Sequence, residues 1–409
     1  MQRFANAFRS VVRQPGFPGL LASGFILGLA YSFVVPFMSL WGTVAVGMRP
    51  IVFGLFMTTT SLCAVVINVS LARWSDARGA RRNVLLLCAT GGILGYLGYA
   101  FARDVIALTI IGSLAIGLAS SSFSQVFAYA REELGRPENA TANRPLLMSL
   151  LRAFFSLAWT IGPALGAAVM IKFSYRGIFI AASLLFVVFL GGVFAFVRHR
   201  PRTAADRHAA REPLRQVLTR PVILAHFVGF ALIFAAFSMN MMNLPLTVTE
   251  VLGGSERDVG LIFGISPVFE VPLMIWFGRL AAQGHQVALI RFSALVAVAY
   301  FLALSLTRAP WHIYPLQFLV AATIAVTTNV AITFFQDLLP GQAGLATSVY
   351  ANAFTTGNLV GYFGFGMLVG VVGHRGLFLV CAGLAAVSSA IFIGYRHTAA
   401  PMAAAARAA

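Results

Sequence analysis

Two charged side chains stand inside long apolar runs of this 409-residue sequence. Glu270 lies in Pro267-Val-Phe-Glu-Val-Pro272, and Arg152 lies in Leu151-Arg-Ala-Phe-Phe-Ser-Leu-Ala-Trp159. A charge in hydrocarbon is costly, so each residue indicates a group that binds a ligand or carries a proton. The alternative is structural, with the two charges paired to each other or satisfied by neighbouring carbonyl groups.

Glu270 is the only carboxylate that the sequence places well inside hydrocarbon depth. Burial favours the neutral form of a carboxyl, whereas water or a cation such as Arg152 favours the charged form. A carboxyl held between these influences can take up a proton on one side of a membrane and release it on the other. We therefore expect Glu270 to couple proton movement. The competing interpretation is a permanently ionised partner that holds its helix against that of Arg152.

Uncharged polar residues recur at helical spacing in several apolar runs. The stripes are Ser121, Gln125 and Glu132; Ser149, Arg152, Ser156 and Trp159; Asn329, Thr333 and Gln336; and Ser348, Asn352 and Thr356, with Asn240 and Asn243 in a further run. Polar residues along a single helix can serve simply to form hydrogen bonds to a neighbouring helix. Stripes on at least four helices at similar depths predict a shared polar cavity.

The chemistry of this cavity is amide, hydroxyl and aromatic, with one charge of each sign. Sugars need amide and carboxylate groups for their hydroxyls and a flat apolar face for their rings, which Trp159 or Tyr31 would supply unless they serve ordinary packing. A pocket for cationic drugs would hold more acid and more aromatic surface. The predicted binding residues are Tyr31, Gln125, Arg152, Trp159, Asn240, Asn243, Glu270, Asn329 and Asn352.

Catalytic and metal-binding patterns are absent from the sequence. It has no Walker-type loop, no His/Glu pair with zincin spacing and no GxSxG motif. The three cysteines, Cys63, Cys88 and Cys381, stand singly in apolar runs, as small buried residues do. We expect neither an enzyme nor a bound metal or cofactor.

The elements that position these residues are long apolar segments. Only 10% of the residues are charged, against about 25% in soluble domains. Twelve segments approach or exceed the ~20 residues that span a bilayer, and period-2 alternation is absent. The approximate spans are 18–45, 50–73, 83–102, 105–131, 144–172, 175–198, 221–248, 256–280, 287–307, 311–337, 342–372 and 375–396. The sequence predicts an all-α integral membrane protein.

The positive charges predict an orientation. With both termini in the cytoplasm, that side carries 21 of the 29 basic residues and the opposite side carries seven, which is the bias of cytoplasmic loops. These charges stand singly or in short runs rather than on one soluble face, so we expect no nucleic-acid partner.

The chain divides into two similar halves. A basic linker at 199–220, which has almost nothing to bury, separates a six-helix bundle at 1–198 from another at 221–409. Pro36 and Gly54 in the first half correspond to Pro245 and Gly260 in the second, at offsets of 209 and 206 residues. These echoes favour a duplicated six-helix unit.

The loop Asp76-Ala-Arg-Gly79-Ala-Arg81-Arg82, with the duplicated plan, resembles the major facilitator superfamily. The signature of that superfamily reads roughly Gly-x-Leu-Ala-Asp-Arg-x-Gly-Arg-Arg. Asp76, Gly79 and Arg81 match it, while alanine stands in place of the first Gly and of the Arg after the Asp. The resemblance implies twelve transmembrane helices in two pseudo-symmetric bundles. We expect Asp76, Gly79 and Arg81 to form a conformational gate, in which a carboxylate can pair with arginines and a helix N-terminus.

Longer runs are similar to the sugar efflux transporter family within that superfamily. They are Ser124-Gln-Val-Phe-Ala-Tyr-Ala-Arg-Glu-Glu133, Arg152-Ala-Phe-Phe-Ser-Leu-Ala-Trp-Thr-Ile-Gly-Pro163, Phe269-Glu-Val-Pro272 and Phe335-Gln-Asp-Leu-Leu-Pro-Gly-Gln-Ala-Gly-Leu-Ala-Thr347. This resemblance implies export of sugars or glycosides across the bacterial inner membrane by alternating access, in exchange for protons. We expect a monomer surrounded by membrane lipid. The alternatives are a multidrug efflux proton antiporter and a membrane receptor or scaffold that moves no solute.

Overall fold

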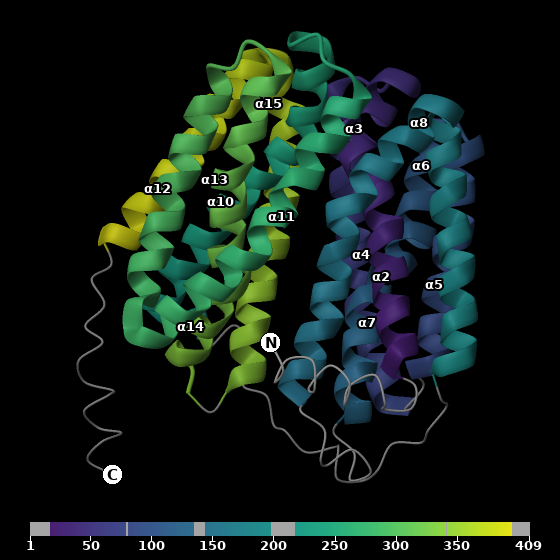
Figure 1. Ribbon diagram of the computed structural model, residues 1–409, viewed down its shortest axis with the longest axis horizontal. Coiled ribbons are helices and arrows are strands. Elements are labelled where there is room, and N and C mark those ends of the chain that lie inside the picture. Colours follow the sequence, from purple (N-terminus) through teal and green to yellow (C-terminus); the bar gives the residue numbers. More distant parts are fainter. Residues whose placement is uncertain (1–16, 79–80, 135–143, 198–216, 341, 395–409) are drawn as a thin grey trace.

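The computed structural model describes residues 17–78, 81–134, 144–197, 217–340 and 342–394, and it is built almost entirely of helices (Figure 1). The helices before residue 198 are α2 (Phe17–Val34), η1 (Val35–Phe37), α3 (Met38–Leu40), η2 (Trp41–Ala45), α4 (Pro50–Arg78), α5 (Arg81–Phe101), α6 (Val105–Ile111), η3 (Gly112–Ile116), α7 (Gly117–Leu134) and α8 (Arg144–Phe196). The later helices are α10 (Pro221–Leu246), η6 (Thr247–Val251), α11 (Glu256–Leu280), η7 (Ala281–His285), α12 (Gln286–Ser305), η8 (Pro310–His312), α13 (Ile313–Ala325), η9 (Val326–Val330), α14 (Ala331–Leu338) and α15 (Ala343–Gly394).

Nine continuous helical stretches in the described residues are long and apolar enough to cross a membrane. Three of them, of 47, 50 and 51 residues, are long enough for two crossings at about 20 residues each. Each contains one residue with positive φ, namely Ser174, Gly284 or Gly373. These residues lie in the gaps that the sequence predicts between spans. The nine stretches are therefore compatible with twelve spans, and the count of twelve stays a prediction.

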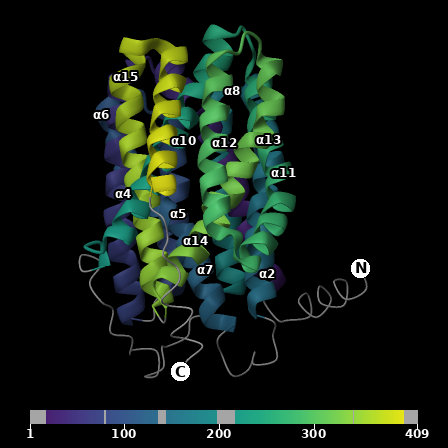
Figure 2. The same cartoon turned by 90° about the vertical axis from the view of Figure 1, so that its left-hand side faces the viewer.

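The helices form two bundles that stand side by side. In Figure 1 the purple-to-blue helices α2 to α8 lie on one side, and the green-to-yellow helices α10 to α15 lie on the other. The view turned by 90° shows the long helices running in roughly one direction (Figure 2). We call the end of the molecule at which α5 begins the Arg81 end. The opposite end, at which α4 begins, is the Gly54 end.

The backbone repeats between the two bundles at a fixed offset. A π-helical segment begins at Trp41 and another begins 206 residues later at Thr247. Each is followed by a glycine with positive φ, Gly47 at 78° and Gly253 at 66°, a conformation that other residues rarely adopt. The matching backbone bonds are Val46 N to Trp41 O at 2.9 Å and Leu252 N to Thr247 O at 3.0 Å. This recurring geometry agrees with the duplicated unit that the sequence echoes predict.

Aromatic side chains fill the core of the first bundle. The Trp41 ring, 1% exposed, packs against Tyr99 and Phe179 at 4.9 Å between ring centroids in both pairs. Such rings supply a large buried apolar area and prefer tilted or edge-to-face contacts. This cluster packs the end of α5 and the part of α8 just after Ser174 around Trp41.

The two bundles meet through small residues near the Gly54 end. A Cβ atom added to Gly54 on α4 would lie 2.6 Å from the Cα atom of Gly366 on α15. On the other side of the interface, a Cβ atom added to Gly264 on α11 would lie 2.9 Å from the carbonyl oxygen of Thr160 on α8. Glycine at these positions lets the helix backbones approach closely. The bundles are therefore packed backbone to backbone at the Gly54 end.

Candidate functional site

Polar side chains are exposed on α8 and α15 toward the Arg81 end. Arg152 on α8 is exposed, and so are Ser348, Asn352 and Thr356 along one face of α15. Arg152 lies close enough to Tyr350 of α15 for its charge to act on the tyrosine hydroxyl. Lipid would leave such groups unsatisfied, whereas water or a polar ligand would not. The structure thus brings Arg152 of the first bundle near Tyr350 of the second, whereas Ser348, Asn352 and Thr356 lie on another face of α15.

Asn352 uses part of its hydrogen-bonding capacity within its own helix. Its Nδ2 donates to the carbonyl oxygen of Ser348 at 2.7 Å. Asn352 is exposed, and its side-chain oxygen accepts no hydrogen bond from a described residue. This arrangement suits an acceptor for a hydroxyl donor.

Glu270 is half-buried on α11 and has no hydrogen bond or ion pair to any residue that the structure describes. In particular, no ion pair joins it to Arg152, so the described structure gives no support to a permanent pair between the two charges. One turn earlier, the Oγ atom of Ser266 is buried and has no hydrogen-bond partner within the described ranges. A carboxyl and a hydroxyl on one face of α11 therefore have no hydrogen-bonding partner among the described residues.

Asn329 lies beside the same stretch of α11. It belongs to the π-helical segment η9, and its Nδ2 donates to the carbonyl oxygen of Met274 at 3.2 Å. Met274 follows Glu270 by one helical turn. The π-helical segment η9 widens the helix locally, as such segments often do at functional positions. The Asn329 amide therefore lies beside Met274 and Gly278, one to two turns beyond Glu270 along α11.

The two asparagines of α10 are buried inside the second bundle and have protein partners. Asn240 Nδ2 donates to the Tyr300 hydroxyl at 3.3 Å, while its Oδ1 is buried and has no partner in the part of the chain that the structure describes. Asn243 Nδ2 donates to the carbonyl oxygen of His374 at 2.9 Å, and Asn243 Oδ1 lies 2.7 Å from His374 Nδ1. Asn240 thus has one acceptor to offer, whereas Asn243 is fully engaged with His374.

Tyr31 and Trp159 are both partly buried in the first bundle. The Tyr31 hydroxyl donates to the carbonyl oxygen of Ala119 at 2.6 Å, and its ring meets Phe186 edge to face at 6.0 Å. Ordinary packing accounts for these contacts of Tyr31. Trp159 is on α8, two turns beyond Arg152, and keeps part of its surface free.

Arg81, a predicted gate residue, contacts Gln125, a predicted binding residue. Its Nε and Nη2 donate to Glu132 Oε1 at 2.9 and 2.7 Å, and its Nη1 donates to Gln125 Oε1 at 3.0 Å. Gln125 is 2% exposed. The gate residues Gly79 and the side chain of Asp76 lie outside the described residues.

Sequence reasoning missed three partners of the predicted residues: Tyr300, Tyr350 and His374. Tyr300 and Tyr350 carry no local signal, because tyrosines are common in membrane helices. His374 stands in the predicted gap between two spans, where a polar residue is expected and attracts no attention. In the described residues, no group of three or more His, Cys, Asp or Glu side chains is placed to hold a metal ion.

The chain is similar to known transporters over most of its length. The family described as Major Facilitator Superfamily matches residues 20–354 and 226–408. A putative sugar efflux transporter of Deinococcus radiodurans is 34% identical over 90% of this chain and 94% of its own length. Sugar efflux transporter A of Dickeya chrysanthemi is 30% identical over 89% of this chain and 92% of its own.

A solved structure shares the fold. The crystal structure of the nucleoside transporter NupG superimposes with a TM-score of 0.79 over 93% of this chain and 99% of that one. The two sequences are only 12% identical, so this likeness concerns the arrangement of helices and not the substrate.

Proposed function

The chain belongs to the major facilitator superfamily and, within it, to the sugar efflux transporters, and on that premise we propose that it exports sugars or glycosides. It is a secondary active transporter of the bacterial inner membrane that works by alternating access and exchanges its substrate for protons. The observation that carries the proposal is the 34% identity to a putative sugar efflux transporter over 90% of the chain.

The substrate site lies between the bundles, where Arg152, Trp159, Asn352 and Glu270 come from α8, α15 and α11. Arg152 offers five donors to sugar hydroxyls, and Trp159 offers a flat face. Asn329 and the free acceptor of Asn240 extend the set from the second bundle. The remaining predicted residues hold the surrounding helices in place through their protein partners; they are Tyr31, Gln125 and Asn243. The transporter works as a monomer, because both faces of the site come from one chain.

Alternating access is supported by the unequal packing of the two ends of the molecule. At the Gly54 end the backbones of α4 and α15 touch, whereas at the Arg81 end Arg152 and Asn352 are exposed. Rocking of one bundle against the other around the site would reverse this inequality. The bundles at 1–198 and 221–409 are the moving bodies, and the basic linker at 199–220 joins them.

Glu270 is the coupling acid. Its half-buried position without a partner among the described residues supports this role, because such a carboxyl responds to whether water reaches it. Asp76, Gly79 and Arg81 form the gate at the cytoplasmic side. The excess of basic residues on the side of both termini supports this orientation.

Alternating access is tested with a bulky substitution that prevents α4 and α15 from packing closely at the Gly54 end. In Gly366→Trp the new ring has no room against Gly54, so labelled sugar still binds in detergent but its exchange across reconstituted vesicles stops. Gly370→Trp is the matched control, since a Cβ atom there meets nothing within 4 Å. Normal exchange in Gly366→Trp would rule out movement at this contact.

The substrate class is tested by competition. Export of sugars predicts that unlabelled sugars or glycosides abolish exchange of labelled sugar and that lipophilic cations do not. Competition by the cations at lower concentrations than the sugars would favour the multidrug alternative. Absence of any flux in active, folded protein would favour the receptor or scaffold alternative.

A further inference from the structure

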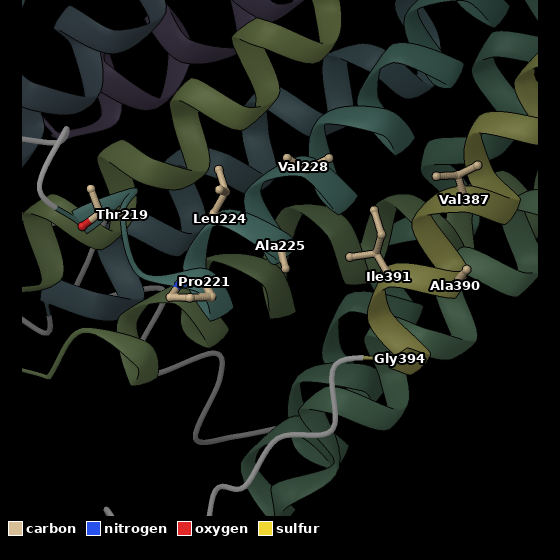
Figure 3. A pocket seen from close by; sticks show the side chains of 9 residues that line it. All are labelled: Thr219, Pro221, Leu224, Ala225, Val228, Val387, Ala390, Ile391 and Gly394. Carbon is tan, nitrogen blue, oxygen red and sulfur yellow. The ribbon is translucent and has the colours of Figure 1, made fainter.

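A groove runs along the surface between the first two turns of α10 and the last two turns of α15 (Figure 3). It encloses about 720 Å³. The side chains that line it are Thr219, Pro221, Leu224, Ala225, Val228, Val387, Ala390, Ile391 and Gly394. Thr219 alone among these residues carries a polar side chain.

Apolar side chains of both helices form the two sides of the groove. Figure 3 shows Leu224 and Val228 on α10 across from Val387 and Ile391 on α15, with the small side chain of Ala225 between Leu224 and Ile391. A hydrogen bond joins α10 and α15 directly beside the groove. Ser388 Oγ of α15 donates to the carbonyl oxygen of Gly229 of α10 at 2.8 Å.

The lining defines what fills the groove. Ordered water needs two to four polar partners, and a sugar needs more, so neither suits this surface. Both helices are of membrane-spanning length, and the lining residues Leu224, Val228 and Val387 are exposed apolar side chains, as expected of a surface that faces hydrocarbon. An unfilled groove there would forfeit dispersion contacts along its whole length. An acyl chain from the surrounding bilayer provides them.

The mouth of the groove carries positive charge. Arg220 stands between the lining residues Thr219 and Pro221, is exposed, and makes no ion pair with a described residue. It is also the N-cap of α10, whose first turn has no side-chain cap. An anionic headgroup at the membrane surface is attracted to such an arginine.

We propose that this groove is a binding site for an anionic phospholipid of the membrane, with one acyl chain between α10 and α15 and the headgroup at Arg220. The site is separate from the transport site, and it does not depend on which solute is carried. Bound lipid would join the start of α10 to the end of α15 at the membrane surface.

The test uses the full-length protein in detergent with equimolar phosphatidylglycerol and phosphatidylcholine, read by native mass spectrometry. Arg220→Gln removes the headgroup contact, and Arg279→Gln is its control because Arg279 is exposed near the end of α11 without lining the groove. Ala225→Trp fills the groove, and Val188→Trp, at an exposed position of α8, controls for the added ring.

We expect the wild type to retain phosphatidylglycerol about fivefold more than phosphatidylcholine, the factor that corresponds to one arginine at an anionic surface. Arg220→Gln should lose this preference and Arg279→Gln should keep it. Ala225→Trp should lose bound phosphatidylglycerol, whereas Val188→Trp should not. Equal retention of the two lipids by the wild type, or unchanged retention in Ala225→Trp, overturns the proposal. Dimers that disappear in Ala225→Trp would show instead that a second copy of the chain covers the groove.

Discussion

Replacing Arg81 tests whether burial or charge decides the strength of the contacts at the start of α5. Its guanidinium donates to the carboxylate of Glu132, which is 46% exposed, and to the amide oxygen of Gln125, which is 2% exposed. Arg81→Met removes both contacts while keeping an apolar stem. The substitution leaves the exposed carboxylate of Glu132 in contact with water, but it leaves the buried amide oxygen of Gln125 without a donor.

We expect the contact of Arg81 with the uncharged Gln125 to contribute more to the free energy of unfolding than its contact with Glu132. An exposed ion pair contributes about 0–1 kcal/mol, because water screens it and the side chains lose freedom. A buried acceptor that loses a charged donor costs about 1.5–3 kcal/mol, because water does not replace the lost bond. We therefore expect the coupling of Arg81 to Gln125 to exceed its coupling to Glu132 by about 1–2 kcal/mol.

Double-mutant cycles separate the two contacts. Arg81→Met is combined with Gln125→Met in one cycle and with Glu132→Gln in the other, and the free energy of unfolding is measured by reversible titration with denaturing detergent. The cycles isolate each pair from the other interactions of Arg81. A coupling to Glu132 that equals or exceeds the coupling to Gln125 would refute the reasoning.

Three further substitutions have defined outcomes. Gly229→Ala places a Cβ atom within 2.4 Å of the Phe392 ring and should lower the free energy of unfolding by about 1–3 kcal/mol through overpacking; an unchanged thermal unfolding midpoint would contradict this. Arg152→Lys keeps the charge but loses the planar fork, so sugar binding measured by calorimetry should weaken clearly, and an unchanged dissociation constant would remove Arg152 from the site. Asp76→Asn should keep sugar affinity but slow exchange, and normal turnover at equal membrane abundance would exclude the gate.

The helix boundaries follow from the sequence because a membrane segment must be long and apolar. The predicted gap at 172–175 contains Ser174, and the gap at 280–287 contains Gly284, both with positive φ. The echo between Gly54 and Gly260 also has a structural counterpart, because both glycines lie where the bundles touch. Length, hydropathy and small residues are local properties, so they can be read along one segment.

The neighbours of each polar residue do not follow from the sequence. Gln125 and Asn243 sit on polar stripes that predict a cavity, yet Gln125 accepts from Arg81 and Asn243 bonds with His374. Helical spacing says which residues share a face, but the rotation of each helix is set by packing against its neighbours. The π-helical segment that holds Asn329 is likewise a product of this packing and has no local sequence signal.

Coupling through Glu270 is the central claim, and uphill transport into reconstituted vesicles measures it most directly. Vesicles with an acidic lumen should accumulate labelled sugar above the external concentration in the wild type. Glu270→Gln should lose this accumulation while exchanging sugar down its gradient nearly as before. Glu250→Gln, a control at a half-exposed carboxylate, should accumulate sugar like the wild type. Accumulation by Glu270→Gln at the wild-type level would contradict the account.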